Sequence, residues 1–166
     1  LENPIHKEDL IEEIQQEAIQ QLLAHGLSEE RIREIWGVPG DDYFLREGVD
    51  NIVWHSLEIN AHGNSATPLI SIRQTSDQQF EGATQIFIFM KDEPNLFAVT
   101  TATLDQLNLS IQDARIMTSN NRNAVDTYIV LDENGDSIGN DKARIEQIKQ
   151  TLTTALSTPE DYNNVI

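Results

Sequence analysis

The sequence predicts an α+β protein in which an all-α segment precedes a small antiparallel sheet covered by two helices. Up to residue 62, apolar residues recur at helical spacing, whereas several later segments alternate apolar and polar residues as strands do. A small polar stretch with glycine, residues 63–67, separates the two patterns. We therefore expect four parts: a helical segment at 1–62, a linker at 63–67, a second domain at 68–157, and a tail or linker at 158–166.

The first segment predicts three helical regions. One face of the first helix carries Ile11, Ile14, Ala18, Leu22 and His25. Gly26 follows at a position where glycine commonly ends a helix, and Ser28 is a predicted N-cap for a second helix at 29–36. A short helical turn at 43–45 and a last helix at about 50–61 complete the segment.

The second segment predicts the order β-(βαββα). Strands are expected at 69–74, 85–90, 109–118 and 123–132, and helices are expected after the N-caps Asp92 and Asp141. A strand, helix, hairpin and helix of these lengths is typical of a split βαβ, ferredoxin-like sandwich. Because no convincing strand follows Leu156, the extra N-terminal strand is expected to take the missing place as a hairpin partner of 85–90. The predicted spatial order is 69–74, 85–90, 123–132, 109–118.

Composition excludes several classes of function. A net charge of −17 argues against a nucleic-acid partner, because phosphate binding needs clustered Lys and Arg. No apolar run approaches the ~20 residues of a membrane span, so we expect no membrane contact and no export. The chain has no cysteine, which favours a cytoplasmic location. Since it begins with Leu1, we expect it to be part of a longer protein.

The corner Asp92-Glu93-Pro94, between a predicted strand and a predicted helix, allows two interpretations. Backbone N–H groups at a helix N-terminus bind anionic groups such as an α-carboxylate, but an N-cap followed by proline needs no ligand. Elsewhere, the spacing at 132–136 does not fit a calcium loop, and the four histidines do not form a zinc motif. The sequence therefore predicts no catalytic residue and no metal site.

Three motifs resemble an ACT domain, namely residues 91–97 (KDEPNLF), 113–118 (DARIMT) and 126–131 (DTYIVL). The upstream runs 40–46 (GDDYFLR) and 52–55 (IVWH) resemble the helical segment that precedes the first of two ACT domains in the bacterial bifunctional PII uridylyltransferase/uridylyl-removing enzymes. The resemblance covers about residues 22–156.

This resemblance implies a regulatory, nitrogen-sensing segment. Enzymes of this family attach UMP to the PII protein when glutamine is scarce and remove it when glutamine is plentiful. Their transferase part uses a magnesium-binding Gly-Ser and paired-Asp motif, and their removing part uses a His-Asp metal motif. The sequence has neither dipeptide, so we expect no cofactor and no enzyme activity in this chain, with magnesium confined to the parent's catalytic domains.

Two hypotheses follow for the function. In the first, the domain relays glutamine status to absent catalytic domains, with L-glutamine, other ACT domains and, through the parent, PII as partners. In the second, it is an interaction module that pairs ACT domains through the edge strand at 109–118. Asn95 stands where amino-acid-binding ACT domains commonly carry glycine, and its side chain is expected to crowd a ligand. The candidate ligand-binding residues are Asp92, Glu93, Pro94, Asn95 and Leu96 at the corner, with Asp113 and Arg115 on the facing strand.

Overall fold

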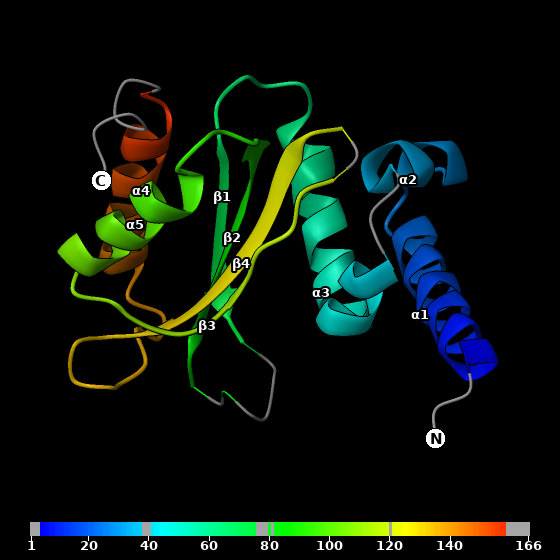
Figure 1. The fold of residues 1–166 in the computed structure, drawn as a ribbon, viewed down its shortest axis with the longest axis horizontal. Coiled ribbons are helices and arrows are strands. Elements are labelled where there is room, and N and C mark those ends of the chain that lie inside the picture. The colour runs from blue at the N-terminus through cyan, green and yellow to red at the C-terminus, as the bar shows by residue number, and fades with distance from the viewer. Residues whose placement is uncertain (1–3, 38–40, 76–79, 81, 120, 159–166) are drawn as a thin grey trace. The chain divides into compact units, whose positions relative to one another are not determined.

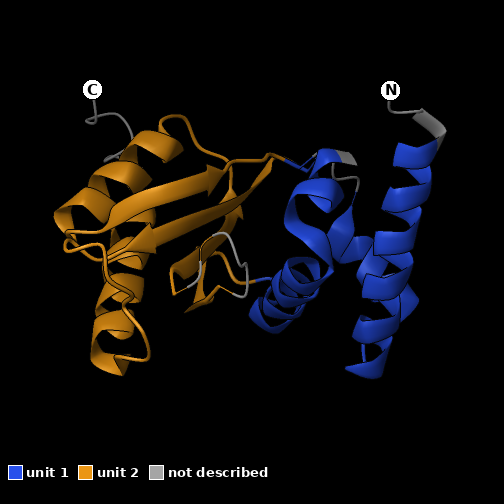
Figure 2. Ribbon diagram, turned by 90° about the horizontal axis from the view of Figure 1, so that it is seen from below, with its two compact units in different colours: residues 1–64, 119–121 blue, residues 65–118, 122–166 orange. Residues whose placement is uncertain are grey.

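The computed structural model describes residues 4–37, 41–75, 80, 82–119 and 121–158. Gly40 and the predicted tail beyond residue 158 lie outside the described residues. The chain forms two compact units, coloured separately in Figure 2. Unit 1 comprises residues 1–64 and 119–121, and unit 2 comprises residues 65–118 and 122–166. Each unit has its own architecture.

Unit 1 is built from the helices α1 (Pro4–Ala24), α2 (Glu29–Trp36) and α3 (Asp41–His62). Helix α1 packs along α3, and α2 contacts both. Gly26 has a φ of 96° just beyond the end of α1, which a residue with a Cβ rarely adopts. The Ser28 side chain accepts a hydrogen bond from the Arg31 backbone N–H at 3.1 Å. These two helix-boundary predictions are confirmed.

Helix α3 differs from the prediction, which placed a short turn and a separate helix in this stretch. The structure has one element from Asp41 to His62, with a kink at Gly48 (φ 78°, ψ 167°). Glycine adopts a positive φ without steric conflict, so the two helical pieces join through a single non-helical residue. The predicted interruption is therefore real, but it is one residue long.

Unit 2 contains a four-stranded antiparallel sheet with two helices (Figure 1). The spatial order β1-β2-β4-β3 is the predicted one, and it makes β1 and β3 the edge strands. Helices α4 and α5 lie together on one face of the sheet (Figure 1). The elements are β1 (Leu69–Gln74), β2 (Thr84–Lys91), α4 (Leu96–Gln106), β3 (Ser110–Arg115), β4 (Asn123–Leu131) and α5 (Lys142–Leu156). The ferredoxin-like ACT fold class is confirmed.

The core of unit 2 lies between the sheet and the two helices. Alternate residues of β4 face it, because successive side chains of a strand point to opposite faces. This core consists of Ile70, Ile86, Ile88, Leu96, Val99, Leu104, Leu107, Leu109, Ala124, Tyr128, Val130, Ile148, Leu152 and Leu156. Helix α5 begins as predicted, since the Asp141 side chain accepts a hydrogen bond from the Arg144 N–H at 3.1 Å.

Strand β3 is shorter than the predicted strand at 109–118. Its pairing with β4 shifts between Ile111 and Asp113, where the chain carries an irregularity of the bulge type. Beyond Arg115 the regular ladder stops, although Thr118 still forms an isolated antiparallel bridge with Ala124. A short edge strand with a bulge is a common way to end pairing at the border of a sheet.

Candidate functional site

The predicted corner lies where β2 ends and α4 begins. The Asp92 backbone N–H donates to the Arg122 carbonyl at 2.8 Å, which ties the corner to the turn of the β3–β4 hairpin. The next residues form a turn, which the hydrogen bond from the Leu96 N–H to the Glu93 carbonyl closes at 3.2 Å. Pro94 is exposed at the tip of this turn. The corner is therefore a hydrogen-bonded turn with an accessible backbone.

Asn95 is the residue that gives the corner its shape. Its backbone is left-handed, with φ 66° and ψ 14°, and it directly precedes α4. Asn is one of the few residues besides glycine that adopts this conformation readily. The corner therefore keeps the backbone path that glycine would give, while the exposed Asn95 side chain remains the departure noted in the sequence.

The expected capping of α4 by Asp92 is wrong. The helix begins at Leu96, its N-cap is Asn95, and no side chain makes a capping hydrogen bond there. A left-handed residue at the N-cap turns the chain sharply, so the helix starts three residues later than the acidic residue suggested. Because the first N–H groups of any α-helix lack an acceptor within the helix, this uncapped end can bind an anionic group.

The first turn of α4 has one buried side and one exposed side. Leu96 is buried in the core, whereas Phe97 is 51% exposed. The Phe97 ring stacks on Tyr128 of β4, with centroids 6.3 Å apart. An exposed aromatic side chain therefore lies beside the corner.

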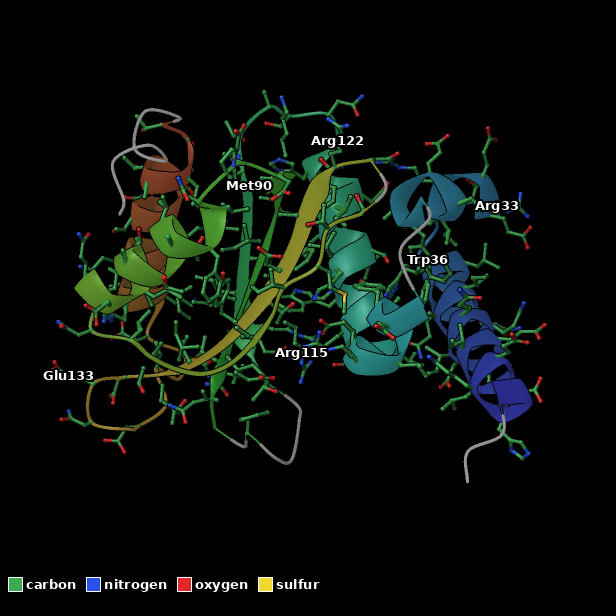
Figure 3. The ribbon with its side chains drawn as sticks, in the orientation of Figure 1. Arg33, Trp36, Met90, Arg115, Arg122 and Glu133 are labelled. Atoms are coloured by element: carbon green, nitrogen blue, oxygen red, sulfur yellow. The ribbon has the colours of Figure 1, made fainter. Side chains whose placement is uncertain are left out.

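Asp113 and Arg115 form an ion pair at the exposed-edge strand β3, with Arg115 Nε 3.3 Å from the Asp113 carboxylate. Figure 3 labels Arg115. Arg115 lies opposite Thr127, whereas Asn123 lies opposite Lys91 at the corner. Thr127 and Asn123 are four residues apart in β4. Arg115 and the corner are therefore separated by about 13 Å along the strand. Within unit 2, the structure gathers the five corner residues but does not bring the ion pair to them.

A buried polar group that the sequence patterns did not predict lies on the helix-facing side of β4. Asp126 is 2% exposed and Tyr128 is fully buried. Burial, with a smaller contribution from the negative charge of Asp92, raises the pKa of Asp126 to about 7, although a backbone hydrogen bond from Met117 opposes the shift. Burial and the Asp126 charge likewise raise the pKa of Tyr128 above its usual range. The available signal was a carboxylate at an inward-facing position of a strongly apolar strand.

Neither metal binding nor membrane insertion finds support among the described residues. No three His, Cys, Asp or Glu side chains in these ranges are grouped so that they could hold a metal ion. None of the described helices is both long and apolar enough to cross a membrane.

Comparisons with known proteins place these features in a family. Residues 6–58, which span most of unit 1, match the family model described as "Uridylyltransferase GlnD fifth domain". The whole chain of 166 residues is 46% identical to part of a bifunctional uridylyltransferase/uridylyl-removing enzyme of Pseudomonas aeruginosa PAO1 and 47% identical to one of Azotobacter vinelandii. The chain belongs to this family, as a segment of such an enzyme.

The similarity to bifunctional uridylyltransferase/uridylyl-removing enzymes is continuous but limited to one part of them. The chain spans 18% of the length of the Pseudomonas aeruginosa and Azotobacter vinelandii relatives. A relative from Pseudomonas fluorescens is 45% identical over the same 166 residues. No solved structure matches the chain. Both units, including the corner and Asp126, therefore lie within a segment shared with these enzymes.

Proposed function

We propose that unit 2 is a regulatory domain that senses L-glutamine and relays nitrogen status to the uridylyl-transferring and uridylyl-removing domains of the longer enzyme. In this proposal the relay acts in the cytoplasm on an enzyme that modifies PII, and magnesium serves the catalytic domains rather than this segment. The fold class and the similarity of the whole chain to part of a bifunctional uridylyltransferase/uridylyl-removing enzyme support it.

The observation that carries the proposal is the left-handed backbone of Asn95 at the uncapped start of α4. The Leu96 N–H already donates to the Glu93 carbonyl, so the α-carboxylate of glutamine would bind the N–H groups that follow it in the first turn of α4, where the helix dipole favours negative charge. Pro94 and Asn95 are exposed, so a ligand can reach this turn. Binding would shift activity only through different affinities for two arrangements of the enzyme.

Isothermal titration of the 166-residue chain with L-glutamine tests the proposal. We expect saturable heat that fits one site, and we expect L-glutamate to compete weakly because its side chain adds a negative charge. Asn95→Val, which resists a left-handed backbone, should weaken binding at least tenfold, a change of about 1.4 kcal/mol. Asn108→Val is the matched control, since Asn108 is also left-handed but lies beyond the far end of α4. No heat up to millimolar glutamine would rule out sensing by this domain alone.

A second candidate function, pairing with another ACT domain, is favoured by the free edge of β3. Among the described strands, β3 pairs with β4 alone, and Ile111 on it is 37% exposed. An exposed edge strand with an apolar side chain can add a strand from a partner. In sedimentation experiments, Ile111→Lys should abolish self-association, whereas Gln112→Lys, at the adjacent exposed position, should not. A chain that stays monomeric at high concentration would exclude self-pairing.

A further inference from the structure

Asp126 occupies an unusual position in the core of unit 2. It lies between Ala124 and Tyr128 on the helix-facing side of β4 and pairs across the sheet with Ile88 of β2. Only 2% of the residue is exposed. A carboxylate is rarely buried this deeply without a cationic partner, because removing its charge from water is costly.

The carboxylate of Asp126 holds the chain that follows β3. At Met117 the regular ladder has already ended. The Met117 carbonyl accepts a hydrogen bond from the Val125 N–H at 2.8 Å. The Met117 N–H donates to Asp126 Oδ1 at 3.2 Å. Beyond the end of the regular ladder, the Asp126 side chain therefore takes the place of a backbone carbonyl as the acceptor for the Met117 N–H.

The groups that face Asp126 do not neutralise it. From the end of β2, Asp92 adds a like charge, and on β4 itself the neighbour is Tyr128. Helix α4 places the Thr100 hydroxyl near Tyr128, and this hydroxyl donates to the Leu96 carbonyl at 2.8 Å. By strand alternation Arg115 points to the opposite face. Among the described residues, no cationic side chain forms an ion pair with Asp126.

These surroundings make the two protonation states unequal. A neutral carboxyl group can stay buried and still accept the Met117 N–H through its carbonyl oxygen. An ionised carboxylate is opposed by burial and by Asp92, and it gains free energy if the chain opens and admits water. Burial raises the pKa of Asp126 to about 7, so the ionised form becomes populated near neutral pH.

We propose that Asp126 is a proton-dependent latch that holds the Met117 segment against β4 when its carboxyl group is neutral and releases it when ionised. The segment from Ile116 to Thr118 continues the edge strand β3. Release would therefore change the edge that unit 2 presents, whether or not the domain binds glutamine. The latch thus goes beyond the proposed sensing function.

Amide hydrogen exchange measured by NMR on the 166-residue chain tests the latch. When the Met117 segment detaches, the Asp126 carboxyl meets water and loses its proton, as long as it was protonated in the closed state. Protection of the Met117 amide, corrected for the intrinsic effect of pH, should therefore fall about tenfold per pH unit from about pH 5 and level off near pH 7. The Ile129 amide in the middle of β4 should not follow this fall. A pH-independent Met117 protection, or a parallel fall at Ile129, would overturn the latch.

Two variants and a control separate the latch from general effects of charge. Asp126→Asn keeps a neutral acceptor for the Met117 N–H, so protection there should become independent of pH. Asp92→Asn removes the facing charge and lowers the pKa of Asp126, so the fall should level off at a lower pH. Asp105→Asn, an equal charge change at an exposed position of α4, should behave as wild type. If Asp126→Asn does not fold, an unchanged profile in Asp92→Asn still overturns the proposal.

Discussion

The hydroxyl of Tyr43 and Nδ1 of His55 lie 2.9 Å apart in the interior of unit 1. Tyr43 precedes the kink at Gly48 and His55 follows it, so this hydrogen bond joins the two pieces of α3. Burial, and to a lesser degree the charge of Glu47, raise the pKa of Tyr43. The hydroxyl therefore keeps its proton and can donate it to the imidazole.

Replacing Tyr43 by phenylalanine should destabilise the chain. Tyr43→Phe removes one buried hydrogen bond and leaves the ring contacts in place, so we expect a loss of about 1–3 kcal/mol of unfolding free energy. Urea denaturation followed by circular dichroism measures this loss. An unchanged unfolding midpoint would show that the Tyr43–His55 bond does not stabilise α3.

The same substitution at Tyr128 should have the opposite or no effect. The buried Tyr128 hydroxyl has no hydrogen-bond partner among the described residues. Thr100 is close enough to lower the pKa of Tyr128 in part, but its own hydroxyl donates to Leu96. Tyr128→Phe thus removes an unpaired polar group, and we expect a change between zero and about 1 kcal/mol of added stability in the same urea experiment. A loss of unfolding free energy equal to that of Tyr43→Phe would contradict this prediction.

A third prediction concerns the left-handed residue at the corner. Asn95→Val should destabilise the chain by about 1–2 kcal/mol, because a β-branched side chain conflicts with a positive φ. Asn95→Gly adopts the same backbone without strain, and its effect should stay within about 1 kcal/mol. Thermal unfolding of the two variants checks the order. Equal stability of both would mean that the corner changes its backbone to suit the residue.

The sequence predicted the order of the strands because two independent patterns agreed. Alternating apolar residues located each strand, and the absence of a strand after Leu156 left one place in the sandwich for residues 69–74. Helix boundaries were harder to predict. Asp92 is a good N-cap by residue type, but the left-handed Asn95 moved the start of α4, and this depends on a backbone dihedral that the residue type does not determine.

Only some of the predicted site residues lie together in the structure, and the backbone again decides which. Contiguous residues such as 92–96 stay together in any fold. Whether Asp113 and Arg115 approach them depends on strand register, and a bulge after Ile111 intervenes. In the sequence, Val125, Thr127 and Ile129 stand at alternate positions and indicate a single buried face, which leaves Asp126 on the opposite, exposed one. In the structure Ala124 and Tyr128, on the other face, are buried as well.

A fourth prediction concerns the contact between the two helices of unit 2. A guanidinium nitrogen of Arg144 in α5 donates to the Leu107 carbonyl at the end of α4. A cation at a helix C-terminus satisfies a carbonyl and complements the helix dipole. Arg144→Met should therefore cost about 1–2 kcal/mol in urea denaturation. Lys142→Met is the matched control, since Lys142 is exposed in the first turn of α5, and it should change stability by less than about 0.5 kcal/mol.

The last prediction is the dependence of stability on pH. The folded state holds the pKa of Asp126 at about 7, above the ordinary value of 3.8. The folded chain therefore binds a proton that the unfolded chain has already lost between these two values. The contribution of the Asp126 carboxyl to stability therefore falls as pH rises from about 4 to about 7, and it stays at its lowest value above pH 7.

Asp126→Asn removes this titration while keeping a similar shape and a hydrogen-bond acceptor. The variant should be more stable than wild type at about pH 8, by up to about 4 kcal/mol at ~1.4 kcal/mol per pKa unit. Local opening of the Met117 segment limits the gain, because it relieves the buried charge without global unfolding. The difference should shrink toward zero near pH 4. Guanidinium denaturation at a series of pH values measures it, with Asp105→Asn as the control, and a difference that does not vary with pH would mean that Asp126 is not protonated in the folded chain.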